Sequence, residues 1–373
     1  MPVALIVGAF GQDNPGDEAL LDASVTAVRA QPGWVPLVVT ARPAETTARL
    51  AVDAVRPSDL AAAQAAVRAD ALVVGGGTVF KELHPSTGRS RGALLRRAAA
   101  LTGAFRGRGR PVALIGVGAA PIARSANRRL ARSIVRCSDL LVLRDAESAV
   151  ILAGLGAAAP LRVGADLAWL CSVPPAPMPR VAAAPVGVAV SHLAGGDRLM
   201  DRLADALRPL ARAGHPVEVE PWQGSPRLGA DAVHARRLAR RIGAGASVVP
   251  PPVDLDEAVA RMAGRSVAVA LRFHATVAAA EAGTPFVSVT HEPKLAGIAD
   301  RMGQHAVDPR ASASVIAEAV QQAILGPPPS PEAVTAERRR AEATVDLLGL
   351  VLCGDGPASH LELLDLVPTP TPA

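Results

Sequence analysis

Residues 1–18 are MPVALIVGAFGQDNPGDE, and this stretch sets a pattern that the rest of the chain repeats. Five apolar residues, Val3–Val7, come before a glycine-rich turn, and an alanine-rich stretch follows. A short apolar run that ends in small residues before a helix is typical of a βα unit in a parallel sheet. No basic region precedes the apolar run, so it indicates a first strand and not a signal peptide.

Short apolar runs followed by helical stretches recur along the whole chain. The expected strands of the first half are residues 3–7, 37–40, 71–74, 112–117, 140–143 and 161–163. After a segment rich in Pro and Ala, they are 186–190, 217–220, 247–249, 267–271 and 285–289. The alternation predicts the α/β class, with two tandem Rossmann-like doubly wound domains.

The predicted domains follow from this rhythm. The boundaries are 1–171 for an N-terminal Rossmann-like domain, 172–185 for a linker, 186–327 for a C-terminal Rossmann-like domain, 328–366 for a C-terminal helical segment and 367–373 for a disordered tail. In such sheets, ligands bind beyond the carboxyl ends of the strands. With two sheets, we expect the active site in a cleft between them.

The composition limits the classes of partner. The chain has 373 residues, of which 50% are hydrophobic, yet it contains only five Phe, three Trp and no Tyr. Aromatic residues are too scarce for base-stacking platforms, so we expect no nucleic-acid partner. The net charge of +5 favours a small anionic substrate. Only Lys81 and Lys294 are lysines; the other 37 cationic side chains are arginines, which do not replace a compact, titratable ammonium.

The cysteines indicate a reducing compartment. Cys137, Cys171 and Cys353 are far apart and have no CxxC spacing, so we expect buried thiols and neither a disulfide framework nor a zinc site. No cluster with metal-ligand spacing is present, and no metal is expected. No apolar stretch approaches the roughly 18 residues of a membrane span. We expect a cytoplasmic protein, with peripheral contact to the inner face of the membrane left open.

The first candidate site is the loop after Val7, with Asn14, Gly16, Asp17 and Glu18. Its glycines do not form GxGxxG, and no acidic residue follows the second strand, so a nicotinamide cofactor is not expected. Asp17 and Glu18 equally suit compensation of a helix dipole, and Asn14 suits a turn.

The second candidate is Gly75, Gly76 and Gly77, directly after an apolar strand. Three glycines let the backbone approach a ligand closely, and successive N–H groups can cradle an anion. A tight turn alone would need fewer glycines. The GxxxxGK[ST] pattern of a P-loop is absent.

Cationic and titratable side chains follow the ends of two later predicted strands. Arg144 follows residues 140–143 and can hold a carboxylate or phosphate with two parallel hydrogen bonds, although a surface ion pair with Asp145 or Glu147 is the simpler alternative. In an extended chain, Arg272 and His274 would share one face. Lys294 starts the next predicted helix.

Taken together, these motifs resemble the polysaccharide pyruvyl transferase family. The matching segments, in the family's order, are Gly11 to Ala19, Gly75 to Phe80, Arg144 to Ser148, Gly164 to Asp166, Arg272 to His274, Gly283 to Pro285, and Pro293 with Lys294. The chain departs from the family at His291 and Glu292, where the family tends to have Tyr-Asp before Pro-Lys.

The resemblance implies a glycosyltransferase-B-like architecture and an enzyme that transfers the pyruvyl group of phosphoenolpyruvate to a glycan, as a cyclic ketal, with release of phosphate. It implies that Arg144, His274 and Lys294 bind the donor and catalyse the reaction. Asp17 and Glu18 would face the acceptor. The donor is a substrate, and no further cofactor is implied. The acceptor sugar, lipid-linked or soluble, and the oligomeric state are not indicated.

The chemistry suits these residues. Phosphoenolpyruvate carries a carboxylate and a phosphate, so its site needs at least two fixed cations, which Arg144, Arg272 and Lys294 supply. Histidine is the side chain suited to general acid or base catalysis near neutral pH, so His274 is the candidate for that role. Two alternatives remain open: a nucleotide-sugar-dependent glycosyltransferase of the same architecture, and a non-catalytic ligand-binding relative.

Overall fold

A computed structural model describes residues 1–58, 60–156, 161–170, 184–192, 194, 196–224, 231–354 and 365–367. The chain forms two compact units. The first comprises Met1–Gln12, Asp17–Cys171 and Glu337–Ala373, and the second comprises Asp13–Gly16 and Ser172–Ala336. Of the expected linker, only residues 184 and 185 are described. Residues 368–373 of the expected tail and Cys171 also lie outside the described residues.

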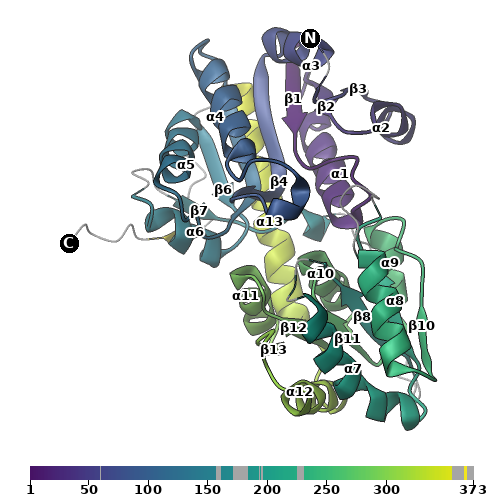
Figure 1. Ribbon diagram of the computed structural model, residues 1–373. Helices are drawn as coiled ribbons and strands as arrows, with labels where there is room; N and C mark the ends of the chain where they lie inside the picture. The colour runs from purple at the N-terminus through teal and green to yellow at the C-terminus, as the bar shows by residue number, and fades with distance from the viewer. Residues whose placement is uncertain are drawn as a thin grey trace. The chain divides into compact units, whose positions relative to one another are not determined.

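The described part of the first unit contains a sheet of eight strands (Figure 1). The strands are β1 (Val3–Val7), β2 (Val35–Val39), β3 (Asp53–Val55), β4 (Ala71–Phe80), β5 (Val112–Ala119), β6 (Leu140–Leu143), β7 (Leu161–Val163) and β14 (Asp365–Val367). Their order is β14-β7-β6-β5-β4-β1-β2-β3. All pairs are parallel except β14 with β7. The order reverses between β1 and β4, which makes a topological switch point there.

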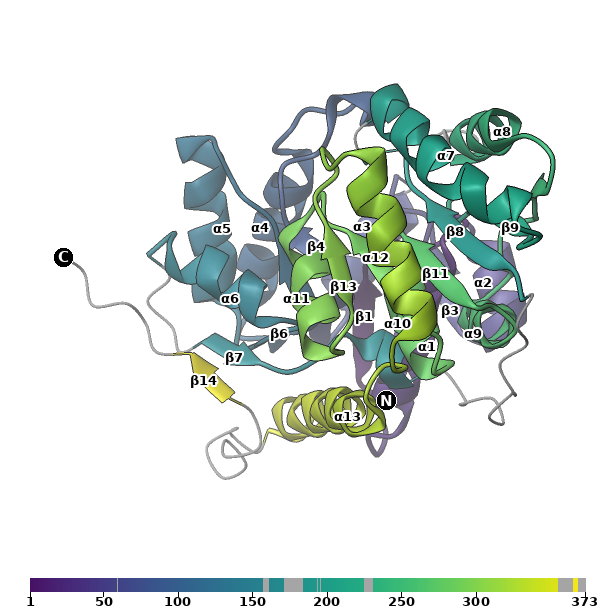
Figure 2. The ribbon, with the colours of Figure 1, turned by 90° about the horizontal axis from the view of Figure 1, so that it is seen from below.

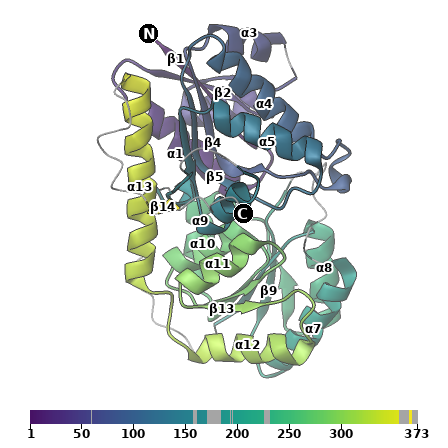
Figure 3. The same ribbon diagram turned by 90° about the vertical axis from the view of Figure 1, so that its left-hand side faces the viewer.

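Helices cover the first sheet. They are α1 (Pro15–Arg29), α2 (Pro43–Leu50), α3 (Leu60–Arg68), α4 (Ala93–Arg106), α5 (Ser125–Cys137), α6 (Ala146–Ala153) and the part of α13 (Pro331–Cys353) from Glu337 onward, with 3₁₀ turns at Pro85–Thr87 and Leu167–Leu170. α4 and α5 pack side by side (Figure 3). Side chains from α3, α4, α5 and α6 form one aliphatic core with the strands, to which Phe80 and Phe105 are the aromatic contributors.

The second unit has its own parallel sheet. Its described strands are β8 (Val186–Val190), β9 (Val217–Pro221), β10 (Ala246–Val248), β11 (Val267–Ala270), β12 (Phe286–Val289) and β13 (His305–Val307), in the order β10-β9-β8-β11-β12-β13. The chain moves from β8 outward to β10 and then returns to the other side of β8 with β11. The switch point therefore lies between β8 and β11, and it is the place where doubly wound sheets bind ligands.

The helices of the second unit are α7 (Gly196–Arg212), α8 (Asp231–Ile242), α9 (Leu255–Ala263), α10 (Phe273–Glu281), α11 (Pro293–Arg301) and α12 (Ala313–Leu325). α7 lies between α8 and α12 (Figure 2), and these three helices enclose an aliphatic core with one face of the sheet. α10 contacts both α9 and α11. None of the described helices is both long and apolar enough to cross a bilayer.

The predicted α/β class with two doubly wound domains is confirmed. Several boundaries differ. β4 continues to Phe80, because β5 keeps it paired beyond Val74, the residue opposite the last residue of β1. α2, β3 and β13 were not expected. The segment 328–366, expected to be helical, ends in strand residues Asp365 and Leu366 of β14.

Candidate functional site

Two polar side chains flank the switch point of the second unit. His192 follows β8, and Arg272 follows β11 and occupies the N-cap position of α10. Their side chains approach each other, with 3.5 Å between Nη2 of Arg272 and Nδ1 of His192. Parallel pairing of β8 with β11 places both at the carboxyl edge of the sheet.

Asp231, the first residue of α8, joins these two side chains. Its side chain is fully buried. Oδ1 accepts hydrogen bonds from the His192 backbone N–H at 2.8 Å and lies 2.7 Å from Nδ1 of His192. Oδ2 accepts from the Gln223 backbone N–H at 3.1 Å and from Nη2 of Arg272 at 2.5 Å. The carboxylate thus ties together residues that follow β8, β9 and β11.

The surroundings of Asp231 keep it ionised. Burial raises the pKa of its carboxyl, but the hydrogen bonds from His192 and the charge of Arg272 outweigh burial, and the pKa lies below its ordinary value. A buried carboxylate without such partners would be costly. Asp231 is therefore an anion at neutral pH that fixes the positions of a guanidinium and an imidazole.

His274 lies in the first turn of α10 and is 9% exposed. The second unit includes Gly16, and a Cβ built on Gly16 would fall 1.9 Å from Nδ1 of His274. Oδ1 of Asn14 accepts a hydrogen bond from the Gly16 N–H at 3.2 Å, the geometry of a turn. Asn14 and Gly16 are thus brought together with His274, and Gly16 leaves the space that the imidazole occupies.

Lys294 lies in the first turn of α11. Its Nζ forms an ion pair with Glu292 and sits 5.9 Å from the centre of the Phe273 ring. The Phe273 ring meets the His274 ring edge-on, with 5.5 Å between their centres. The Phe273 ring is therefore near both the ammonium and the imidazole, and the structure brings Arg272, His274 and Lys294 to neighbouring helix N-termini.

His291 adds a neutral imidazole beside these cations. Burial lowers its pKa from the ordinary 6.5; Glu292 opposes this change, and the charges of Lys294 and Arg272 add to it. His291 and Glu292 are the pair that departs from the resemblance, and both lie in the immediate surroundings of Lys294.

The local backbone differs from the expected extended chain at 272–274. Arg272 is extended, with φ −126° and ψ 134°, but α10 begins at Phe273. The alternation of faces along a strand does not apply there. Arg272 and His274 are held near each other because they form the N-terminus of one helix.

Arg144 belongs to the first unit and is deeply buried. Nε bonds Oδ2 of Asp145 at 2.9 Å, Nη1 lies 3.5 Å from Oδ2 of Asp166, and Nη2 bonds Oγ1 of Thr78 at 3.1 Å. Its side chain is 2% exposed, and both carboxylates are fully buried. The ion pair with Asp145, offered above as a surface contact, lies inside the protein. A Cβ on Gly118 would meet the guanidinium at 2.6 Å, so a glycine is needed beneath it.

Gly75, Gly76 and Gly77 lie within β4 and not in a loop after it. Paired with β5, this backbone forms a sheet ladder in place of the expected anion cradle. A Cβ on Gly75 would fall 2.1 Å from Oγ of Ser24, and one on Gly76 would fall 2.9 Å from Leu20, so both glycines allow α1 to pack closely. Gly77, with φ 75°, has nothing within 4 Å of its Cβ position.

Asp17 and Glu18 lie in the first turn of α1. Oε1 of Glu18 accepts from the Gly11 N–H at 2.6 Å, and Oε2 pairs with Nη2 of Arg49 at 2.9 Å. Burial raises the pKa of Glu18, and the Gly11 hydrogen bond and the Arg49 charge only partly oppose it. Glu18 therefore secures the loop after β1, and both carboxylates occupy the positions that favour the helix dipole.

The sequence interpretation missed His192 and Asp231. A polar residue two positions after the end of an apolar strand was the available signal for His192. For Asp231 no local signal exists, because an acidic residue that starts a helix is common. The described residues hold no group of three or more His, Cys, Asp or Glu that could bind a metal ion. Cys137 and Cys353 are free thiols, but Cys137 is half-buried and Cys353 is exposed, so the expectation of buried thiols is wrong for these two.

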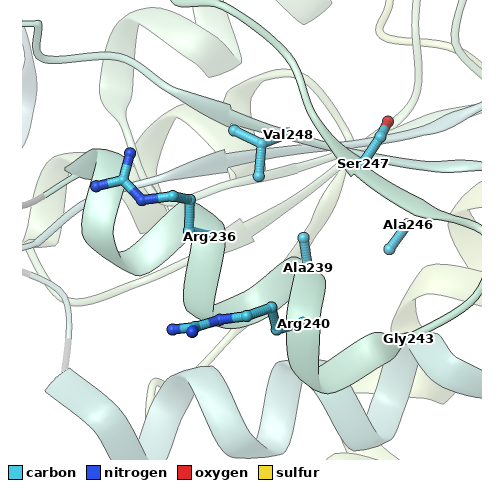
Figure 4. Close-up of a pocket in the computed structure, with 7 residues that line it drawn as sticks. All are labelled: Arg236, Ala239, Arg240, Gly243, Ala246, Ser247 and Val248. Atoms are coloured by element: carbon cyan, nitrogen blue, oxygen red, sulfur yellow. The ribbon is translucent and has the colours of Figure 1, made fainter.

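A surface pocket of about 500 Å³ lies elsewhere in the second unit, between α8 and the edge strand β10 (Figure 4). Arg236 and Arg240 extend from α8 in the same direction there. No residue predicted for the site lines this pocket. It is separate from the cluster at the switch point.

Comparisons with known proteins bear on family and fold. A sequence model described as polysaccharide pyruvyl transferase matches residues 14–293. No curated protein matches the sequence. Similar solved structures include the S. aureus MnaA-UDP co-structure, with 11% identity, a TM-score of 0.63, and coverage of 95% of this chain and 97% of that chain.

Two further structures show the same fold. UDP-GlcNAc 2-epimerase from Neisseria meningitidis bound to UDP-GlcNAc has 14% identity and a TM-score of 0.61, with coverage of 93% of this chain and 99% of that chain. Anabaena Alr3699/HepE in complex with UDP and glucose has 13% identity and a TM-score of 0.58, with coverage of 95% and 97%. At these identities the likeness concerns the fold alone, which is glycosyltransferase-B-like.

Proposed function

Because the chain belongs to the polysaccharide pyruvyl transferase family, we propose that it moves the pyruvyl group of phosphoenolpyruvate onto a glycan or glycan precursor as a cyclic ketal, releasing phosphate. One observation carries the proposal. Arg272, His274 and Lys294 gather at the N-termini of α10 and α11, at the carboxyl edge of the second sheet. Two cations and one acid–base group are what this donor requires.

The cations suit the two anionic groups of the donor. Arg272 is held by Asp231 through Nη2, while its buried Nε has no hydrogen-bond partner among the described residues. Lys294 supplies a compact ammonium, and the helix N-termini add positive potential. We assign one anionic group of phosphoenolpyruvate to Arg272 and the other to Lys294.

The reaction moves several protons. The methylene carbon of phosphoenolpyruvate gains one and becomes a methyl group, and each of the two attacking sugar hydroxyls loses one. Their oxygens form the two new bonds to the ketal carbon, while the bond from this carbon to the phosphate oxygen breaks. Phosphate leaves and takes up the proton of the first hydroxyl, and the proton of the second hydroxyl replaces the one that the methylene carbon received. His274 is the group we assign to donate the proton to the methylene carbon.

The first unit contributes by positioning. With three nitrogens bonded within the protein, Arg144 holds Asp166 and Thr78 in place at the carboxyl edge of its sheet. In line with the family resemblance, we assign Asp17, in the first turn of α1, to the acceptor; Glu18 holds Gly11 and Arg49.

The test uses phosphate release from phosphoenolpyruvate in the presence of lipid-linked sugars, soluble oligosaccharides and glycosylated small molecules, with mass detection of the ketal. We expect release only with an acceptor. His274→Ala and Lys294→Ala should abolish it while thermal unfolding stays cooperative. The control is His305→Ala, at the amino end of β13, which should keep full activity. Full activity of His274→Ala would overturn the mechanism.

A second candidate is a nucleotide-sugar-dependent glycosyltransferase. The observation that favours it is that similar structures of this fold contain UDP or UDP-GlcNAc. It predicts release of UDP from a UDP-sugar and no consumption of phosphoenolpyruvate. Measuring both products in one acceptor screen separates the two functions.

A further inference from the structure

His192 is held in a defined orientation by Asp231. The same carboxylate oxygen accepts from the backbone N–H of His192 and lies 2.7 Å from its Nδ1, so backbone and ring are fixed together. Asp231 is fully buried, whereas the His192 side chain is 12% exposed. The buried anion thus sits behind an imidazole that reaches the surface of the site.

This arrangement determines which ring nitrogen is available. A carboxylate accepts a hydrogen bond from Nδ1–H, so the neutral imidazole carries its hydrogen on Nδ1 and presents the lone pair of Nε2. A buried aspartate that orients a histidine in this way also stabilises the imidazolium after it takes a proton. The pair Asp231–His192 has the form of a general base with its orienting group.

The proposed reaction needs such a second group. When a sugar hydroxyl adds across the double bond of the donor, the methylene carbon takes a proton while the hydroxyl gives one up. A single side chain cannot be acid and base at the same moment. His274 supplies the acid, so a base is required near the cation that binds the donor, and His192 lies 3.5 Å from Arg272.

We infer that His192 is a catalytic base for the acceptor hydroxyl, and that Asp231 is a positioning residue which orients both His192 and Arg272. The inference rests on the proposed function. Nε2 of His192 removes the proton as the hydroxyl oxygen bonds to the central carbon of the donor. The imidazolium then gives this first proton to the departing phosphate, so the base is regenerated for the second hydroxyl, and the second proton returns to His274 in place of the one given to the methylene carbon.

Several charged and titratable groups lie next to this base or act on residues near Arg272. Asp231 on α8 and Arg272 at the start of α10 contact it directly. His291, Glu292 and Lys294 follow β12, and Arg272 and Lys294 both influence His291. Because other groups titrate nearby, the test compares pH profiles between variants and does not rest on the profile of the wild type alone.

The experiment measures ketal formation by wild type, His192→Gln and Asp231→Asn from pH 5 to 9, together with phosphoenolpyruvate binding by calorimetry. We expect His192→Gln to lower kcat by about 10²–10⁴-fold and to remove the acidic limb of the profile, with unchanged donor affinity. Asp231→Asn should lower kcat and shift that limb, and it should also weaken donor binding through Arg272. Arg240→Ala, in the separate pocket on α8, is the control that should change neither.

The outcomes separate the two claims. Wild-type protein that forms no ketal with any acceptor overturns the proposed function, and the role of His192 with it. Active wild type with a His192→Gln variant that keeps its rate and pH profile overturns only the inference. A His192→Gln variant that loses donor affinity in proportion to its rate assigns the residue to binding, and this also overturns it.

Discussion

Gly16 lies so close to His274 that a Cβ on the glycine would fall 1.9 Å from Nδ1 of the imidazole. The glycine is therefore a requirement of the histidine's position and not only of the turn that Asn14 forms. Because residue 16 has no side chain, the His274 imidazole can occupy this space at the N-terminal turn of α10 without a clash.

We predict that Gly16→Ala lowers the rate of ketal formation by about 10²-fold or more, because displacing an acid–base group by an ångström is costly. Kinetic assays and the thermal midpoint measure the two effects separately. Gly103→Ala is a matched control, since Gly103 lies inside α4 with open space at its Cβ position. That control should stabilise the protein by about 0.5–1 kcal/mol. An active Gly16→Ala variant would contradict the close contact.

Arg144 compensates two buried carboxylates, Asp145 and Asp166. Arg144→Met removes the cation and leaves both anions without it, so we predict a loss of about 3–5 kcal/mol in the free energy of unfolding. Urea denaturation of the variant and of the wild type measures this difference in the free energy of unfolding. Arg42→Met breaks an exposed pair with Glu45 and should cost less than about 1 kcal/mol. Equal effects of the two variants would show that Arg144 is not a structural cation.

The sequence predicts this fold well where strands are uninterrupted apolar runs. Val186–Val190 is one such run, and its predicted bounds are those of β8. β3 consists of three residues that begin with Asp53, and its pairing with β2 creates it. The glycines at 75–77 were expected in a loop, but pairing with β5 makes them part of β4. Pairing between distant segments decides both cases, and local composition does not encode it.

The same distinction between local pattern and distant pairing holds for the candidate site. Arg272, His274 and Lys294 stand within one stretch of sequence, after two successive strands, and their pattern points to a ligand. Asp231 contacts His192 and Arg272, which are 39 and 41 positions away in the sequence, and no motif spacing predicts either contact. Only the strand order, which puts β8 beside β11, brings the three together.

The ionisation of Asp231 links stability to pH. Its pKa is lower in the folded protein than the ordinary 3.8 of an unfolded aspartate. The folded state therefore binds this proton less tightly, and the stabilisation is fully present above pH 3.8 and is lost as the pH falls through the folded pKa. In Asp231→Asn, we predict a shallower fall of the unfolding free energy below pH 4. Urea titrations from pH 3 to 7 measure the slope, and an unchanged slope would contradict the assignment.

The pKa of Glu18 shifts in the opposite direction, so its effect on stability has the opposite dependence on pH. Its pKa is raised above the ordinary 4.5, chiefly by burial, so the folded state binds this proton more tightly than the unfolded state does. Its contribution is fully present below pH 4.5 and is lost as the pH rises through the folded pKa. Gln at this position keeps an oxygen for the Gly11 N–H and removes the charge. We therefore predict that Glu18→Gln loses less stability than wild type as the pH rises from 4.5 to 7. The substitution also removes the ion pair with Arg49, but this pair is partly exposed and contributes little to the free energy of unfolding. Parallel urea titrations of the two proteins measure this difference, and identical pH dependences would rule out the buried carboxyl as its source.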